Sequence, residues 1–158
     1  MKTVVRILLI GWLCGWMNHP CAAAQDKAAD STFNFLLTQP KDTNLVKSLN
    51  SLGIQYEFSD SAFAEKVYLQ ALSISRQLKN PRLECKSLTN LGILYKTYNN
   101  LTSAAWYQTL NLAVAEKAGL VLEKGKALVN LGNVYNAGSQ NSKALGTYLK
   151  AVTYLEKA

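Results

Sequence analysis

The sequence predicts an all-α fold, a helical-hairpin repeat solenoid built from three pairs of antiparallel helices. Two observations carry this prediction. The block Leu-Gly-x-x-Tyr occurs three times, and its glycines, Gly53, Gly92 and Gly132, lie 39 and 40 residues apart. Between these blocks, apolar residues recur at intervals of three and four, the spacing of one face of an α-helix. A period of this length is typical of helix pairs that stack on one another.

The first residues have the pattern of a secretory signal peptide. Lys2 and Arg6 precede an apolar run over residues 7–17, and a cleavage point follows Ala24. We therefore expect residues 1–24 to be a cleaved leader and the mature chain to be periplasmic or secreted. The apolar run is shorter than the roughly 20 residues that span a bilayer, so no stable membrane span is expected, and an uncleaved anchor is the less favoured alternative.

The mature chain offers few groups for catalysis. The only histidine, His19, and two of the three cysteines lie in the leader, which leaves Cys85 alone. Without histidine no Ser-His or Cys-His pair and no imidazole metal ligand can form, and Cys85 lies in an apolar helical pattern typical of a core residue. We expect no enzyme activity, no cofactor and no bound metal. The excess of basic residues is spread along the chain, so nucleic-acid binding is not expected either.

A polar lead-in precedes the first helix. Residues 25–42 are mostly polar, with room for one short helical turn before Pro40 breaks it. Apolar residues at helical spacing then predict a helix over 43–58, with Asp42 or Thr43 capping its exposed amides.

The second helix and the next pair follow in the same way. A helix is expected over 61–79, after which Asn80 is a cap and Pro81 stands in the first turn, where its missing amide hydrogen costs nothing. Asn99 and Asn100 are expected to end one helix and open the next.

Aligning the pairs gives three repeats, over about 43–80, 81–119 and 120–158. Each second helix begins with an alanine, namely Ala64, Ala104 and Ala144. A tyrosine and a second alanine follow in the first and third repeats, but the middle repeat has Gln108 and Asn111 at these places. We expect the three glycines to face the small alanines where the two helices of a repeat approach closely, with Tyr56, Tyr95 and Tyr135 packed beside the contact.

These residues resemble the tetratricopeptide repeat (TPR) family, in the variant whose period is near 40, and the resemblance covers about residues 43–158. With the leader, the chain is similar to the sensory TPR segments of bacterial signalling proteins. The resemblance implies a concave face, lined by the first helix of each pair, that binds a protein or an extended peptide. A non-enzymatic interaction scaffold is therefore expected. The alternative is a periplasmic sensory fragment of a larger two-component or transcriptional signalling protein.

A lysine precedes each Leu-Gly by the same interval, so stacking should align the three lysines as a ladder that attracts acidic groups. Asparagines nearby can both donate to and accept from a peptide backbone. The candidate groove residues are Lys47, Asn50, Lys86, Asn90, Lys126, Asn130 and Asn133. Only Asn90 and Lys126 match the carboxylate clamp of co-chaperone TPR proteins, so a receptor for chaperone tails is not expected. A plain solvated face of lysines is the open alternative.

The last helix has more apolar positions than one packing face can use: Leu145, Tyr148, Leu149, Val152 and Leu155. We expect some of them to be exposed. This end would then pair with another copy of the chain or be followed by further repeats.

Overall fold

A computed structural model describes residues 20–158, with side chains described from residue 27 onward. Its helices are α2 (Pro20–Leu37), α3 (Thr43–Tyr56), α4 (Ser61–Gln77), α5 (Pro81–Thr97), α6 (Leu101–Lys117), α7 (Val121–Ala137) and α8 (Asn141–Leu155). No strand occurs in this part of the chain, and the all-α prediction is confirmed. Helix α2 and the segment Thr38–Ala158 belong to two compact units, each described separately below.

Helix α2 is longer than the sequence predicted. Instead of one short turn within residues 25–42, a continuous helix of 18 residues begins at Pro20. The reason is local, because five of its first ten residues are alanine, the residue with the highest helix propensity. The helix ends ahead of Pro40, as expected. The leader predicted over residues 1–24 falls mostly outside the described residues and stays a prediction. None of the described helices is long and apolar enough to cross a membrane.

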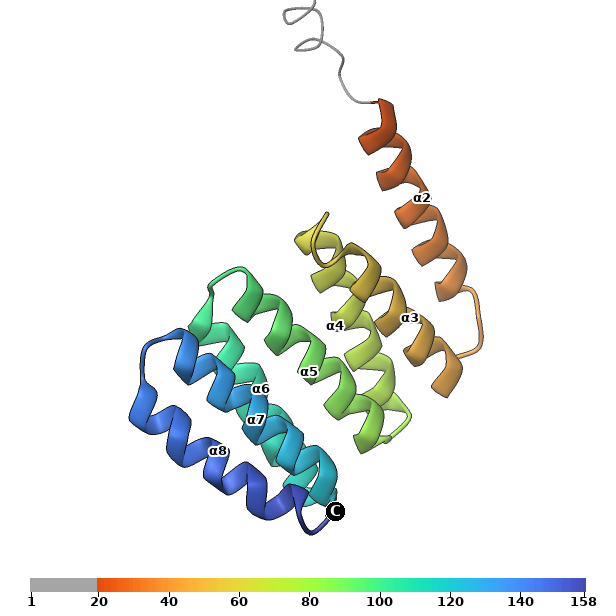
Figure 1. Cartoon of the computed structure of the whole chain (residues 1–158). Helices are drawn as coiled ribbons and strands as arrows, with labels where there is room; N and C mark the ends of the chain where they lie inside the picture. The colour runs from red at the N-terminus through yellow and green to blue at the C-terminus, as the bar shows by residue number, and fades with distance from the viewer. Residues whose placement is uncertain (1–19) are drawn as a thin grey trace, which may run out of the picture. The chain divides into compact units, whose positions relative to one another are not determined.

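Helices α3 to α8 form three antiparallel pairs, α3 with α4, α5 with α6 and α7 with α8 (Figure 1). The first helices of the pairs, α3, α5 and α7, contact one another in succession. In Figure 1 they lie on the nearer side of the array, with α4 and α6 behind them. We call the surface formed by α3, α5 and α7 the first-helix face.

Polar caps begin several helices as the sequence predicted. Asp42 Oδ1 accepts hydrogen bonds from the backbone amides of Asn44 and Leu45, at 2.9 and 2.8 Å. Asn80 caps α5, which has Pro81 in its first turn, and Asn100 caps α6. These side chains satisfy amides that have no partner within the helix.

Four helices are followed by a residue in the left-handed backbone region. These residues are Lys79, Asn99, Gly119 and Ser139, with φ angles of 51°, 59°, 66° and 57°. A left-handed residue reverses the chain tightly after a helix, and its amide bonds back to the last helical turn. These four positions recur every twenty residues, so the helices from α5 to α8 begin at a regular spacing along the chain.

The glycines do allow a close approach of the two helices of each repeat, and the atoms nearest to them belong to a larger side chain than the predicted alanine. A Cβ added at Gly132 would lie 2.5 Å from Cε1 of Tyr148, too close for any real contact. The corresponding Cβ at Gly53 would overlap the ring of Tyr68, and at Gly92 the amide of Gln108. Each glycine therefore makes room for the large side chain one helical turn after the alanine. That longer side chain reaches across to the first helix and lies against the glycine.

The tyrosines that follow the glycines pack on the second helix of their own repeat. Tyr56 meets Phe63 edge to face at 5.0 Å between ring centroids, and Tyr95 stacks on Tyr107 at 5.3 Å. Such ring pairs add to the apolar burial within a pair.

Candidate functional site

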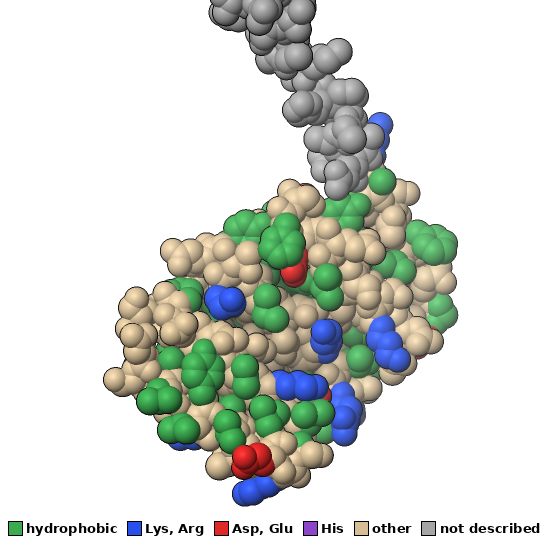
Figure 2. All heavy atoms as spheres, viewed as in Figure 1, with side chains coloured by type: hydrophobic (Ala, Val, Ile, Leu, Met, Phe, Trp, Pro, Cys, Tyr) green, Lys and Arg blue, Asp and Glu red, His purple; other side chains and the backbone are tan. Residues whose placement is uncertain are grey.

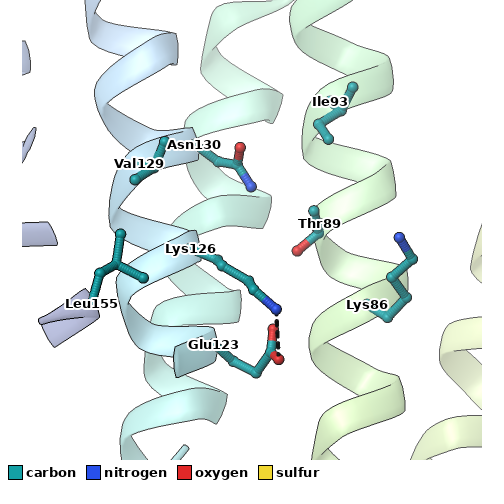
Figure 3. Close-up of a pocket in the computed structure, with 8 residues that line it drawn as sticks. All are labelled: Lys86, Thr89, Ile93, Glu123, Lys126, Val129, Asn130 and Leu155. Carbon is teal, nitrogen blue, oxygen red and sulfur yellow. Dashed lines mark hydrogen bonds and ion pairs between the residues drawn. The ribbon is translucent and has the colours of Figure 1, made fainter. Parts of the chain in front are cut away.

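A groove of about 430 Å³ opens on the first-helix face, between α5 and α7 (Figure 3). Its lining residues are Lys86, Thr89, Ile93, Glu123, Lys126, Val129, Asn130 and Leu155. On each helix they recur at intervals of three or four, so one stripe of each helix faces the groove. Other faces of the same two helices, which include Leu88 and Leu131, are buried within the array.

The groove carries two lysines and one glutamate. Nζ of Lys126 lies 3.2 Å from Oε1 of Glu123, three residues before it on α7. Because the Lys126 side chain is half exposed, this ion pair is weak. Lys86 is exposed and has no acidic partner among the described residues, and the same is true of Lys47 on α3, which lies outside the groove. Figure 2 shows several lysine and arginine side chains over this face, some of them close to one another.

Two of the predicted groove asparagines are buried between α3 and α5. Asn90 Nδ2 donates to Asn50 Oδ1 at 2.8 Å, and Asn50 Nδ2 donates to Ser87 Oγ at 3.1 Å and to the carbonyl of Val46 at 2.9 Å. These amides join the first repeat to the second. The structure therefore does not support a role for Asn50 and Asn90 in contacting a peptide.

The other two asparagines lie in different surroundings. Asn130 is half-buried in the groove, and Figure 3 shows its amide pointing from α7 toward α5. Asn133 Oδ1 accepts a hydrogen bond from the Tyr148 hydroxyl at 2.7 Å, within the third repeat. Of the seven predicted residues, Lys86, Lys126 and Asn130 thus share one groove.

Sequence reasoning missed the apolar part of the groove. Ile93 directly follows the glycine of its repeat and is only partly buried, and Ile54 at the same place in the first repeat is 45% exposed. In the sequence, the isoleucine directly after the glycine in the first two repeats is the signal that would have pointed to this position. Thr89 was missed because it lies among buried neighbours on α5.

Two polar side chains of α6 donate hydrogen bonds to Thr89. Asn111 Nδ2 donates to Thr89 Oγ1 at 2.8 Å, and Gln108 Nε2 donates to the Thr89 carbonyl at 3.2 Å. The amide oxygens of Gln108 and Asn111 are buried and accept no hydrogen bond from the described residues. The middle repeat therefore has a polar contact beneath the groove where the other repeats have a tyrosine and an alanine.

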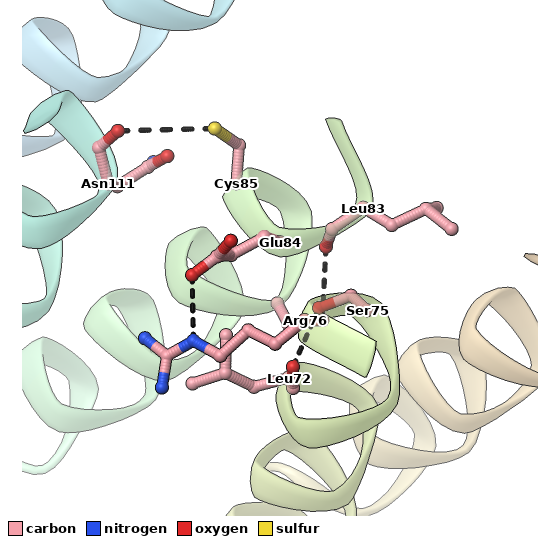
Figure 4. A network of polar contacts seen from close by, with 8 residues as sticks. Leu72, Ser75, Arg76, Leu83, Glu84, Cys85 and Asn111 are labelled. Carbon is pink, nitrogen blue, oxygen red and sulfur yellow. Dashed lines mark hydrogen bonds and ion pairs between the residues drawn. The ribbon is translucent and has the colours of Figure 1, made fainter. Parts of the chain in front are cut away.

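Cys85 is part of the core, as its sequence pattern predicted. It is fully buried, and its Sγ lies 3.9 Å from the Asn111 carbonyl (Figure 4). Burial, with the charges of Glu123 and Glu84, raises the pKa of Cys85 to about 12, so the thiolate that a nucleophile requires is scarce at neutral pH. Among the side chains described, residues 27–158, no three His, Cys, Asp or Glu gather to hold a metal ion.

Comparisons with known proteins identify the fold. No protein-family model matches the sequence, and a search of curated proteins finds no significant match. Among solved structures, the TPR domain of Arabidopsis FLU matches with a TM-score of 0.64 at 21% identity, covering 75% of this chain and 100% of that domain. BtubC from P. vanneervenii matches with a TM-score of 0.64 at 21% identity, covering 72% of this chain. The chain spans about half of BtubC, 48% of its length. The chain thus has a TPR-like helical repeat fold.

Proposed function

We propose that this chain is a non-enzymatic protein-interaction module that holds an extended, acidic segment of a partner protein in the groove between α5 and α7. The observation that carries the proposal is the lining of this groove, where exposed lysines alternate with partly buried apolar side chains on two neighbouring helices. The TPR-like fold supports it, because arrays of stacked helix pairs commonly bind partners along such surfaces.

The chemistry of the groove favours a segment in which acidic and apolar residues alternate. Ile93 and Val129 offer apolar contacts, and the Asn130 amide can both donate to and accept from an extended backbone. Lys86 and Lys126 attract carboxylates. A carboxylate of the partner competes with Glu123 for Lys126 but meets no such competitor at Lys86. Lys86 is therefore expected to contribute more to binding than Lys126.

The test begins with selection of peptides from a random display library on the full chain. We expect the selected peptides to be rich in Asp and Glu with interspersed apolar residues. Their affinity should fall by about five- to tenfold in the double variant Lys86→Glu with Lys126→Glu, and by a smaller factor at high salt, where exposed charges are screened.

Lys150→Glu is the matched control, because Lys150 is also exposed but lies on α8, outside the groove. It should leave the affinity unchanged. If the selected peptides bind the double variant as tightly as the unmodified chain, the lysines are only a solvated surface and the proposal is wrong.

A further inference from the structure

Helix α8 presents an apolar stripe with no partner. Leu145, Leu149 and Val152 are 61%, 62% and 47% exposed. They recur at intervals of four and three and therefore share one face of the helix. Figure 2 shows apolar side chains gathered over the α8 end of the array. The expectation that part of this helix is exposed is confirmed.

Two of the three equivalent places on the other second helices are covered by the next helix pair, but the place of Leu149 is not, since Leu69 there is 41% exposed. Counted from the alanine that begins each second helix, Val152 corresponds to Leu72, which is 5% exposed. Leu145 corresponds to Glu65, whose carboxylate accepts a hydrogen bond from the hydroxyl of Tyr95 on α5. It also corresponds to Ala105, which lines a cavity together with residues of α7. Leu145 and Val152 on α8 thus belong to the surface that, in the earlier repeats, receives the first helix of the following repeat.

An ion pair joins each second helix to the first helix of the following repeat. Arg76 near the end of α4 pairs with Glu84 of α5 at 2.7 Å between Nε and Oε1 (Figure 4). Glu116 near the end of α6 pairs with Lys124 of α7 at 2.5 Å between Oε1 and Nζ. Glu84 and Lys124 occupy equivalent places, eight residues before their glycines, so the second pair repeats the first with the charges exchanged.

Glu156 occupies the place of Arg76 and Glu116 on α8. It is exposed and has no basic partner among the described residues. Helix α8 therefore has at this place the charge that accepts a helix like α7, with a lysine near its start, and disfavours a helix like α5, with a glutamate there.

We propose that Leu145, Val152 and Glu156 form a docking surface for an amphipathic helix of a partner protein. This helix packs apolar residues against the stripe and pairs a lysine or arginine near its N-terminus with Glu156, as α7 does on α6. A second copy of the chain fits less well. Its α5 and α7 are already packed within the array, and α3 has the apolar Leu45 at the place of Lys124.

The test uses α7 as the probe. A fluorescein-labelled peptide of residues 119–138 is titrated with the full chain and followed by fluorescence anisotropy. We expect saturable binding that Val152→Glu weakens by about tenfold or more, because a buried charge replaces an apolar contact at the place of the buried Leu72. Leu149→Glu is the matched control, since Leu149 lies on the same helix face but its counterpart on α4, Leu69, stays 41% exposed where the next pair is docked. It should leave the affinity nearly unchanged.

A charge exchange tests the ion pair. Glu156→Lys should weaken binding of the probe by up to about fivefold, and a probe carrying Lys124→Glu should recover the loss. The absence of saturable binding, or equal losses in Val152→Glu and Leu149→Glu, would overturn the proposal. Sedimentation velocity provides the other decisive result. The proposal is also wrong if the chain forms a dimer that Val152→Glu dissociates and that the probe does not disrupt, because a second copy then covers this surface.

Discussion

Tyr68 and Tyr148 each lie against a glycine of the neighbouring helix and also make a hydrogen bond through the hydroxyl. Tyr68 donates to Glu57 Oε2 at 3.1 Å, and Tyr148 donates to Asn133 Oδ1 at 2.7 Å. A side chain that is held at both its ring and its hydroxyl cannot easily move aside. A methyl group added at Gly53 or Gly132 therefore forces the two helices apart.

A pair of glycine substitutions measures this constraint. Gly132→Ala should lower the free energy of unfolding by about 1–3 kcal/mol, the cost of overpacking a close contact. Gly146→Ala is the control, because a Cβ at Gly146 has no atom within 4 Å, and alanine there should stabilise α8 by about 0.5–1 kcal/mol. Urea denaturation compares them. Equal shifts in the two variants would contradict the packing argument.

After each of the four helices α4 to α7, the chain reverses through one residue in the left-handed backbone region. Lys79, Asn99 and Ser139 adopt positive φ angles without being glycine, while the equivalent residue after α6 is Gly119. An L-residue with a side chain is strained in this region by about 1 kcal/mol. These turns are kept because the next helix must begin at once, with its cap in the adjoining position.

Exchanging glycine and serine between two equivalent turns tests this strain. Ser139→Gly should raise the free energy of unfolding by about 0.5–1 kcal/mol, and Gly119→Ser should lower it by a similar amount, because each turn keeps the same φ angle. Thermal unfolding followed by circular dichroism gives both values. A lower melting temperature for Ser139→Gly would show that its side chain stabilises the turn in some other way.

Contacts between repeats couple the array into one unit. The buried amides of Asn50 and Asn90 join α3 to α5, and the Tyr95 hydroxyl joins α5 to Glu65 of α4. The hydrogen bond to Glu65, with burial, raises the pKa of Tyr95. Burial likewise raises the pKa of Tyr68 and of Cys85.

These raised pKa values predict a loss of stability in alkali. In the unfolded chain the phenols lose their protons near pH 10 and the thiol near about 8.5, whereas the folded chain keeps them at higher pH. The unfolded state then binds fewer protons, so the free energy of unfolding falls as the pH rises from about 9 toward 12. Urea midpoints at several pH values measure the fall. Tyr95→Phe removes one of these groups and should make the fall shallower. An unchanged slope would contradict the assignment to Tyr95.

The repeat, the fold class and most helix boundaries followed from the sequence, because they depend on local order along the chain. Local features of the sequence predicted these elements: the spacing of apolar residues, the helix caps Asp42 and Asn80, Pro81 and the recurring glycines. Each of them acts over a few neighbouring residues, so its effect on the helix does not depend on the rest of the fold. The long α2 is the exception among local features, where alanine content outweighed a polar pattern.

The roles of individual polar side chains required the folded chain. Asn50 and Asn90 look alike in sequence to Asn130, yet the first two meet across a buried contact between residues 40 positions apart, and the third faces an open groove. The partner of each glycine depended in the same way on the length and direction of a side chain from another helix. Burial and hydrogen bonding arise between segments distant in sequence, and the geometry that brings two such segments together exists only after the helices have packed.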